Sequence, residues 1–461
     1  MSALWTASEI AAATGGVASS EFRISGVTFD SREVGGGELF VALRGERTDG
    51  HRFVETAVQQ GAEGLLVSEP VPYPHVRVAD TMAALEAMGA ASRKRADATV
   101  VGVTGSVGKT GVKEAIRLSL ERFAPGAVHA SVKSYNNHTG VPLSLARMPR
   151  ETRFGVFEMG MNHAGEISAL TRQVRPHVAL ITWVASVHIE FFESEEGIAD
   201  AKSEIFEGLE PGGTAIVPWD NRHRERLLAA ALRHAGRIVT FGEGEGADVR
   251  ALRYALHPDC TTVTARVHDE TLTYKIGMAG RHWVNNSLAV IAAVKAAGGD
   301  IAMAGLALAE LSDLPGRGKR SRINLRDGGQ AVVIDESYNA NPTSMAATLA
   351  VLGSTTPAGK GRRIAVLGAM KELGAGSPEF HAGLAQPVID AGVDHVVLVG
   401  AEMEPLHDAL RKRVRSDHVA DFGAAIDAVD ALLRPDDVVL VKGSNSVGLG
   451  LLVRHLLGGD A

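Results

Sequence analysis

The sequence predicts an α/β protein of three domains, and three observations carry this prediction. The chain has 461 residues, enough for about three domains of ordinary size. The stretch VVGVTGSVGKTGVK, residues 100–113, has the order of a buried strand, a glycine-rich loop and a helix. The last third of the chain alternates apolar strands with helical segments. We therefore expect a small N-terminal α/β domain over 1–97, a central domain with a mostly parallel sheet over 98–312, and a C-terminal doubly wound domain over 313–461.

The composition is that of an ordinary folded protein. Hydrophobic residues make up 45% and charged residues 22% of the chain, which leaves no case for disorder. The formal net charge is −7, from 47 Lys+Arg against 54 Asp+Glu, and there is no long basic run. We therefore expect no nucleic-acid partner.

The cysteine content and the lengths of the apolar runs indicate the cellular compartment of the protein. The single cysteine, Cys260, excludes an internal disulfide and gives no reason to expect an oxidising environment. The N-terminus lacks a basic leader, and no apolar run approaches the ~18 residues of a membrane span. These features favour a cytoplasmic enzyme without a membrane span.

The first 97 residues combine short strands and helices around two polar loops. Residues 25–53, SGVTFDSREVGGGELFVALRGERTDGHRF, contain a strand, a glycine turn, a second strand and a polar loop, and a helix follows at 53–60. A strand at 64–68 and a helix at 81–94 complete the unit, and 93–97 indicates a hinge. The loops are rich in Asp, Ser, Arg and His. They can hydrogen-bond a polar small molecule, although solvated turns would have the same composition.

The glycine-rich loop TGSVGKT predicts a phosphate-binding site and a P-loop ATPase-like central domain. Backbone N–H groups and the positive end of the helix would face a polyphosphate, Lys109 would add a positive charge, and the Thr110 hydroxyl could bind Mg²⁺. The usual pattern has glycine where this chain has Val103, and the extra glycine is Gly105. A chance glycine-rich turn is the alternative, but strand, loop and helix stand in the expected order.

Polar residues lie at or after the ends of two further strands of the central domain. Glu158 ends the strand FGVFE, and His188 follows the strand 178–182. Because the carboxyl ends of parallel strands share one edge of a sheet, we expect Thr110, Glu158 and His188 to converge there. The helix 196–209 carries Lys202 beside its apolar stripe, and a loop followed by an apolar helix spans 277–298. Taken singly, a structural histidine, a turn-capping carboxylate and a solvated lysine would be ordinary alternatives.

The C-terminal domain is predicted from regular alternation. Strands AVVID, IAVLG, HVVLVG and VVLVKG are each followed by a helix, starting near residues 343, 379, 424 and 447. This spacing predicts a parallel, right-handed, Rossmann-like doubly wound sheet. Asp335, Lys371 and Lys442 lie at or just after strand ends.

Taken in chain order, the motifs resemble one family. TGSVGKT, SYNNHTGVP, FEMGMNHAGEI, HIEFFES, EGIADAKSEIFEGL, GRHWVNN, PGRGKR, DESYNANPTSM, VLGAMKELG and KGS are similar to the ATP-dependent Mur ligases of peptidoglycan synthesis. SYNNHTGVP, SYNANPTSM and the DSR and DGH loops resemble the members that join D-alanyl-D-alanine to UDP-N-acetylmuramoyl-tripeptide. The resemblance covers nearly the whole chain. It implies ATP and two Mg²⁺ as cofactors, those two small molecules as substrates, and a monomer.

The resemblance also implies roles for individual residues. Lys109, His188 and Lys202 would be catalytic, and Lys202 would be carbamylated. The nucleotide would be bound by Thr104, Gly105, Ser106, Val107, Gly108, Lys109, Thr110, Asn286, Arg317 and Asp335. The metals would be bound by Thr110, Glu158, His188 and Lys202. The UDP-sugar substrate would contact Asp30, Ser31, Arg32, Thr48, Asp49, His51, Asn136 and Asn137.

Some positions depart from the pattern of the family. This chain has Glu336 where a second aspartate is common, and Val187 where alanine precedes the metal histidine. Further departures are Trp183 and Trp283 in place of asparagine, His138 in place of glutamate, and Asn445 in place of arginine. The departures affect contacts to adenine, peptide and amine, and leave the phosphate and metal chemistry unchanged.

Two alternatives remain open. The chain could be another amide ligase of the same superfamily, either the third-residue-adding type or a folylpolyglutamate synthase. It could also be a non-catalytic, nucleotide-gated binding protein, but Lys202 and the HIE segment argue against this because nucleotide binding needs neither. For a ligase, the substrate carboxylate would attack the γ-phosphate of ATP, and an amine would then displace phosphate from the acyl phosphate.

Overall fold

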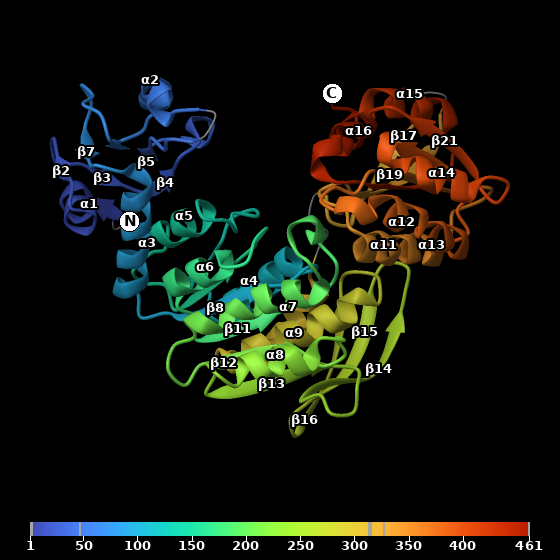
Figure 1. Ribbon diagram of the computed structural model, residues 1–461, viewed down its shortest axis with the longest axis horizontal. Helices are drawn as coiled ribbons and strands as arrows, with labels where there is room; N and C mark the ends of the chain where they lie inside the picture. Colours follow the sequence, from blue (N-terminus) through green and yellow to red (C-terminus); the bar gives the residue numbers. More distant parts are fainter. Residues whose placement is uncertain (1–2, 46–47, 312–315, 326–327, 460–461) are drawn as a thin grey trace.

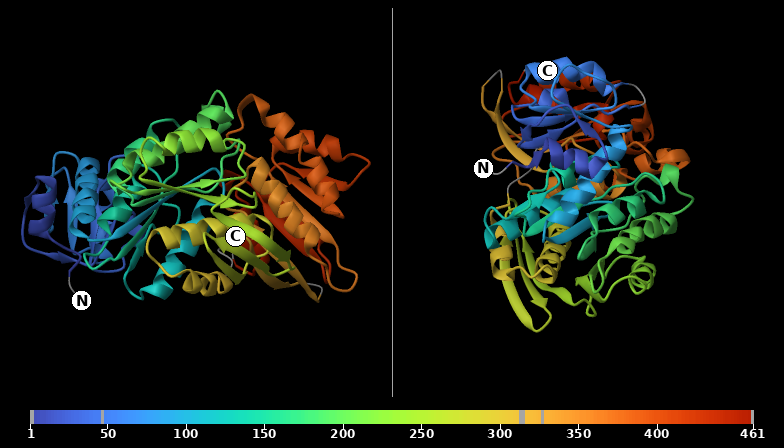
Figure 2. Two further views of the ribbon diagram at one scale, coloured as in Figure 1. Left: turned by 90° about the horizontal axis from the view of Figure 1, so that it is seen from below. Right: turned by 90° about the vertical axis from the view of Figure 1, so that its left-hand side faces the viewer.

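The computed structural model describes residues 3–45, 48–311, 316–325 and 328–459, and these form three α/β domains (Figure 1). The N-terminal and C-terminal domains both stand on the same side of the central domain, as the right-hand view of Figure 2 also shows. The predicted fold class is confirmed. The expected boundary at 97/98 follows a helix and remains a prediction, and the one at 312/313 lies outside the described residues.

The N-terminal domain has a five-stranded sheet in the order β2-β7-β6-β5-β4 and a two-stranded sheet of β1 and β3. Its elements are β1 (Trp5–Thr6), α1 (Ala7–Thr14), β2 (Val17–Ala18), β3 (Arg23–Ile24), β4 (Gly26–Thr28), β5 (Glu38–Val41), α2 (Val54–Gln59), β6 (Gly64–Val67), β7 (His75–Arg77) and α3 (Thr81–Arg95). Helix α3 starts where the Asp80 carboxylate accepts hydrogen bonds from two backbone N–H groups of its first turn.

The N-terminal domain shares its hydrophobic core with the central domain. Leu143 and Ala146, on α5 of the central domain, are fully buried in the same cluster as Trp5 and Leu85. The Trp5 indole N–H donates to the Ala146 carbonyl at 2.8 Å, and Arg93 Nε on α3 donates to a central-domain carbonyl at 2.9 Å. The two domains are therefore joined by buried apolar contact.

The central domain is built on a nine-stranded sheet in the order β16-β15-β14-β13-β12-β11-β8-β10-β9. Its strands are β8 (Thr99–Thr104), β9 (Val128–Ala130), β10 (Phe154–Glu158), β11 (Val178–Ile181), β12 (Thr214–Pro218), β13 (Arg237–Gly242), β14 (Val249–Leu256), β15 (Thr261–Val267) and β16 (Glu270–Ile276). Its helices are α4 (Lys109–Phe123), α5 (Gly140–Ala146), α6 (Glu166–Val174), α7 (Glu195–Ser203), α8 (Arg224–Ala231), α9 (His282–Ala296) and α10 (Ile301–Ala309). Helices α4, α9 and α10 share one buried cluster, and α6, α7 and α8 share another.

Two features of the central domain differ from the simple predicted pattern. Strands β14, β15 and β16 pair antiparallel and extend the otherwise parallel sheet. The helix expected over 196–209 is regular only as far as Ser203 and continues as a 3₁₀ turn, η4 (Glu204–Gly208). The Glu204 carboxylate accepts hydrogen bonds from the N–H groups of Gly165 and Ser168, and a side chain at Gly208 would meet the Thr171 carbonyl at 2.3 Å. These contacts with α6 account for the tighter turn.

The C-terminal domain has a six-stranded sheet in the order β17-β18-β22-β19-β20-β21. Its elements are β17 (Lys319–Asn324), β18 (Gln330–Glu336), α11 (Pro342–Ser354), β19 (Arg363–Gly368), α12 (Ser377–Ala382), α13 (Ala385–Asp390), β20 (His395–Val399), α14 (Glu404–Leu410), β21 (Arg415–Val419), α15 (Phe422–Leu432), β22 (Val438–Lys442) and α16 (Leu449–Leu456). Helices cover both faces, as the doubly wound prediction requires. The sheet is not wholly parallel, because β17 pairs antiparallel with β18.

No helix in the described ranges is long and apolar enough to cross a membrane.

Candidate functional site

A cavity of about 380 Å³ lies where the central and C-terminal domains meet. The phosphate loop, the carboxyl edge of the central sheet and the start of α9 form one side, and residues after β18 and on α11 form the other. The polar residues in its wall include Ser106, Lys109, Thr110, Asn136, Glu158, His188, Asn286, Arg317, Glu336, Tyr338 and Lys442. The predicted convergence of Thr110, Glu158 and His188 is therefore present in the structure.

The phosphate loop has the backbone that its two glycines allow. Gly105 has φ +147°, and a side chain there would meet the Thr182 hydroxyl at 2.0 Å. Gly108 has φ +83° and immediately precedes α4, so the first turn of that helix has no side-chain cap. The first N–H groups of a helix have no partner within the helix. An anion at this point would supply one.

The loop is tied to the segment after β11. The Ser106 N–H donates to the Trp183 carbonyl at 2.7 Å, and the Ser106 hydroxyl donates to the Ala185 carbonyl at 2.9 Å. The Thr182 hydroxyl donates to the Val107 carbonyl at 2.6 Å. These bonds hold the phosphate loop next to the turn that leads to His188.

Lys109 lies inside the loop. Its Nζ donates to the Gly105 carbonyl at 2.7 Å, and burial lowers the pKa of its ammonium. The charge is thus held in place before any ligand binds, at the point where the loop turns into α4.

Glu158 is almost completely buried and both of its oxygens are engaged. Oε2 accepts a hydrogen bond from the Thr110 hydroxyl at 2.8 Å, and Oε1 accepts one from the Asn136 amide at 2.7 Å. Thr110 and Glu158 thus present oxygen atoms, which Mg²⁺ prefers. Within the described ranges no three His, Cys, Asp or Glu side chains form a ready metal cluster. The donors fit Mg²⁺, which is held by one or two protein ligands together with phosphate and water.

His188 lies after β11 and has left-handed backbone, with φ +62°. Its Nδ1 is hydrogen-bonded to the Glu372 carboxylate of the C-terminal domain. This bond lowers the pKa of Glu372, so the carboxylate is ionised and the histidine donates. When the ring is neutral, a hydrogen on Nδ1 leaves the opposite nitrogen, Nε2, as the one that can bind a metal.

Lys202, on α7, is a deeply buried lysine. Its side chain is only 1% exposed, and it makes no hydrogen bond or ion pair with any residue that the structure describes. Burial first, and repulsion by Lys109 second, lower the pKa of its amine well below the ordinary value. Lys202 does not line the cavity, but its charge interacts with that of Lys109.

The C-terminal domain contributes residues that the sequence analysis did not assign. Glu336 lines the cavity, and its Oε2 lies 3.4 Å from Lys442 Nζ, which also donates to the Asn339 carbonyl at 2.9 Å. Burial raises the pKa of Glu336 and lowers that of Lys442. Asp335, the residue that was predicted, is not part of the cavity wall and accepts hydrogen bonds from Gly316 N–H and Ser337. Lys442 was expected at a strand end but was given no role, and the end of β18 could have pointed to Glu336 in the same way.

The segments predicted to bind the sugar substrate lie in the N-terminal domain, apart from this cavity. The Asp30 carboxylate is held by Arg32, whose side chain is 86% exposed, and Ser31 is buried beside it. In the other segment, both ring nitrogens of His51 are in use. Nδ1 is 2.6 Å from the Asp49 carboxylate, and Nε2 accepts the Ser68 N–H at 3.0 Å. Thr48 is exposed.

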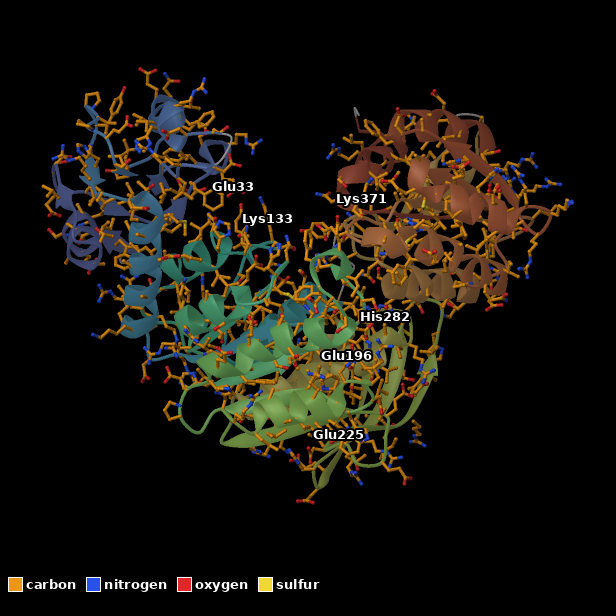
Figure 3. The ribbon with its side chains drawn as sticks, viewed as in Figure 1. Glu33, Lys133, Glu196, Glu225, His282 and Lys371 are labelled. Carbon is orange, nitrogen blue, oxygen red and sulfur yellow. The ribbon has the colours of Figure 1, made fainter. Side chains whose placement is uncertain are left out.

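The predicted residues therefore fall into separate groups. The cavity wall contains Ser106, Val107, Gly108, Lys109, Thr110, Asn136, Glu158, His188, Asn286 and Arg317. It does not contain Thr104, Gly105, Asn137, Lys202, Asp335, or Asp30, Ser31, Arg32, Thr48, Asp49 and His51. His282, at the junction labelled in Figure 3, also lines the cavity, and burial lowers the pKa of its imidazole to about 4.

Comparison with known protein families gives three consecutive matches. Residues 23–104 match the catalytic domain of the Mur ligase family, residues 103–294 match the Mur ligase middle domain, and residues 321–445 match the Mur ligase glutamate ligase domain.

Curated relatives match over nearly the whole chain. The UDP-N-acetylmuramoyl-tripeptide–D-alanyl-D-alanine ligase of Rickettsia prowazekii (strain Madrid E) is 32% identical over 458 residues, covering 98% of this chain and 99% of that protein. The protein of the same name from Synechocystis sp. is 36% identical, covering 95% and 93%.

Solved structures agree. A crystal structure of MurF from Acinetobacter baumannii superposes with a TM-score of 0.84 at 31% identity, covering 98% of this chain and 99% of that one. MurF ligase from Thermotoga maritima in complex with ADP gives a TM-score of 0.74 at 26% identity, covering 94% and 97%.

Proposed function

The chain belongs to the Mur ligase family, and we propose that it joins D-alanyl-D-alanine to UDP-N-acetylmuramoyl-tripeptide at the expense of ATP. The observation that carries this proposal is similarity to ligases of that name over nearly the whole chain. It is supported by a cavity in which a phosphate loop, a carboxylate and residues of a second domain converge. The product is a precursor for peptidoglycan synthesis.

The chemistry requires activation of a carboxylate. A carboxylate resists attack by an amine because oxide is a poor leaving group. The terminal carboxylate of the tripeptide attacks the γ-phosphate of ATP, which gives an acyl phosphate and ADP. The amine of D-alanyl-D-alanine then attacks the acyl carbon, and phosphate leaves. Both steps concentrate negative charge, so the protein acts through positioning and positive charge.

The central domain supplies the phosphate site in this proposal. The N–H groups of the loop 104–110 and the ammonium of Lys109 hold the β- and γ-phosphates. Thr110, Glu158 and the Nε2 of His188 would hold Mg²⁺, which neutralises phosphate charge when bound. The engagement of Glu158 by the Thr110 hydroxyl supports this assignment.

Lys202 is proposed to carry a carbamate and to serve a second Mg²⁺. A neutral amine can react with CO₂, and the lowered pKa of the buried Lys202 favours the neutral form. The carbamate would place a negative group where a cationic lysine would repel both the metal and Lys109.

The rest of the nucleotide is proposed to lie across the junction of the central and C-terminal domains. Asn286 would contact the adenine and Arg317 the phosphates. The carboxylates at the end of β18 are proposed for the ribose. Asp335 was predicted to bind the nucleotide, and Glu336 is the one that lines the cavity.

The sugar nucleotide is proposed to lie between the N-terminal and central domains, against Asp30, Ser31, Arg32 and the loop 48–51, with Asn136 and Asn137 on the other side. Asn136 supports this arrangement, because it lines the cavity and also contacts Glu158. We further propose that the protein is a monomer and acts in the cytoplasm, where ATP and UDP-sugars are found.

A single assay tests the function. Purified protein is incubated with ATP, Mg²⁺ and UDP-N-acetylmuramoyl-tripeptide, and ADP release is followed with and without D-alanyl-D-alanine. We expect sustained release only with the dipeptide, together with a pentapeptide product detected by mass. Release that is independent of the dipeptide, or that requires glutamate or diaminopimelate in its place, would contradict the proposal.

A further inference from the structure

Residues 131–137 of the central domain touch all three domains. Lys133 forms an ion pair with Glu33 of the N-terminal domain at 2.5 Å, and the Tyr135 hydroxyl donates to the same carboxylate at 3.0 Å. Figure 3 shows Glu33 and Lys133 facing one another across the boundary between the two domains. The Ser134 hydroxyl accepts a hydrogen bond from Arg317 of the C-terminal domain at 3.3 Å.

The same segment reaches the carboxylate of the phosphate site. Asn136 donates from its side-chain amide to Glu158 at 2.7 Å, and its carbonyl accepts the Gly160 N–H at 2.8 Å. The Ser131 hydroxyl accepts the Glu158 N–H at 3.3 Å. Seven residues thus connect the N-terminal domain, the phosphate-site carboxylate and the C-terminal arginine.

A buried lysine, Lys113, binds the backbone of residues 131–137. Lys113 lies one turn into α4, the helix that begins at the phosphate loop, and its side chain is 0% exposed. Its Nζ donates to the Ser131 carbonyl at 2.6 Å and to the Lys133 carbonyl at 3.3 Å, and it pairs with Glu114 at 2.5 Å. A lysine ammonium has three N–H donors, and here each has an acceptor.

Burying the Lys113 ammonium has a free-energy cost that its role in stability alone does not explain. Removing an ammonium from water carries a large penalty, and buried ion pairs seldom repay it in stability alone. Lys133, whose carbonyl Lys113 binds, also has left-handed backbone with φ +53°, which is uncommon for a residue other than glycine. The Lys113 ammonium therefore stabilises a backbone conformation of residues 131–137 that is unfavourable by itself.

We propose that Lys113 is a positioning residue that holds residues 131–137 in the conformation linking the sugar-nucleotide side of the enzyme to Glu158. The proposal rests on the proposed function for the identity of the sugar nucleotide. Lys113 does not line the cavity. It acts through the two carbonyls that it binds, which set the places of Lys133, Tyr135 and Asn136.

The test uses Lys113→Met, which keeps the length of the side chain and removes the donors. Lys275→Met, on the exposed face of β16 in the same domain, is the matched control. Amide hydrogen exchange is measured in the ligand-free full chain. We expect exchange of residues 131–137 to rise about tenfold or more in Lys113→Met, while residues 112–123 of α4 and strand β10 keep their protection.

Kinetics provide the second measurement. We expect the KM for UDP-N-acetylmuramoyl-tripeptide to rise about tenfold in Lys113→Met, with the KM for ATP unchanged within about threefold. Lys275→Met should match the wild type in both. Unchanged exchange and KM values would overturn the proposal. Equal changes in both KM values, with protection lost throughout α4, would also overturn it, because they would show a general role in stability.

A second variant guards against misfolding. Lys113→Met leaves Glu114 with only Arg117 as its partner, so the double variant Lys113→Met/Glu114→Gln removes both members of the buried pair. The same local rise in exchange is expected. If neither variant folds, Lys113 is a stability residue and the proposal is wrong. If the wild type fails to use the sugar nucleotide, the proposed function fails, and the exchange measurement still decides the role of Lys113.

Discussion

The Glu372 carboxylate of the C-terminal domain accepts a hydrogen bond from Nδ1 of His188 in the central domain. The Glu190 N–H donates to the Glu372 carbonyl at 3.3 Å, so backbone and side chain of one residue both cross the domain boundary. A carboxylate on the far nitrogen of a metal-binding histidine fixes its tautomer and raises its basicity. Here that carboxylate would come from a different domain.

Glu372→Gln should weaken the apparent affinity for Mg²⁺. An amide can still accept a hydrogen bond but carries no charge, and the loss of such a partner costs about 10- to 100-fold in metal affinity or activity. Titration of Mg²⁺ in the ADP-release assay measures this. Glu379→Gln, exposed on α12, is the control and should behave as the wild type. An unchanged Mg²⁺ dependence would show that the contact does not serve the metal site.

Lys109→Ala should remove most turnover and preserve the fold. In the proposed site the Lys109 ammonium would contact the transferred phosphate, and the loss of one such electrostatic contact costs about 10²- to 10³-fold in rate. The residue contributes no packing to a core cluster, so the melting temperature should move little. Lys94→Ala, on the exposed side of α3, is the matched control. Near-normal turnover would remove Lys109 from the phosphate site.

Variants of Lys202 test whether this residue carries a carbamate or is a plain cation. Lys202→Arg keeps the charge, so it should be as inactive as Lys202→Ala if the charge required is negative. Small carboxylic acids should partly restore activity to the alanine variant only, because they can supply the missing negative group. Steady-state turnover with added acetate or formate measures the rescue. Substantial activity in the arginine variant, without any effect of acids, would refute the carbamate.

A variant of the exposed Arg32 tests whether the N-terminal domain contacts the sugar nucleotide and not ATP. If it contacts the sugar nucleotide, Arg32→Ala should raise the KM for that substrate about tenfold, the value of one charged hydrogen bond. The KM for ATP should stay the same, because Arg32 does not line the cavity. Arg23→Ala, on an exposed position of β3, is the control. Parallel changes in both KM values would give the N-terminal domain a different role.

His129 should make the protein sensitive to acid. Its Nε2 is 2.7 Å from the Ser144 carbonyl, and burial lowers the pKa of its ring to about 4. As the pH falls below about 6.5, the unfolded chain takes up a proton that the folded chain refuses, so stability is lost between there and about pH 4. His129→Gln keeps the hydrogen bond without the titration. Between pH 7 and 5, the free energy of unfolding of this variant should fall by about 2 kcal/mol less than that of the wild type.

Urea unfolding at the two pH values measures this difference. His234→Gln, at an exposed position after α8, is the control and should follow the wild type. Equal acid sensitivity in His129→Gln and the wild type would show that other groups carry the effect.

The sequence was sufficient for features that depend on local order along the chain. A β-branched run before a glycine loop predicted β8 and the start of α4, and the position of Glu158 at a strand end predicted its place beside Thr110. Parallel strands bring their ends to one edge whatever the detailed packing is. The extension β14 to β16 and the antiparallel edge strand β17 were not predicted, because no crossover helix marks their direction.

Contacts made by domain packing could not be predicted. The pairing of His188 with Glu372 joins residues 184 positions apart, and only the arrangement of two domains brings them together. His51 shows a second limit, because loop composition suggested a ligand contact although Asp49 and Ser68 already engage both ring nitrogens. Of Asp335 and Glu336, adjacent on β18, the pattern could not tell which side chain faces the cavity, because that depends on the fold of the following turn.

The apolar cluster that Trp5 and Leu85 share with Leu143 and Ala146 has a consequence for dividing the chain. A fragment beginning at residue 98 would leave the buried face of α5 open to water, and a fragment ending at residue 97 would lose part of its own interior. Neither piece should be soluble on its own. An insertion or deletion in the segments that form this cluster is therefore expected to destabilise both domains. For the same reason, the N-terminal domain cannot be exchanged between relatives as an independent module.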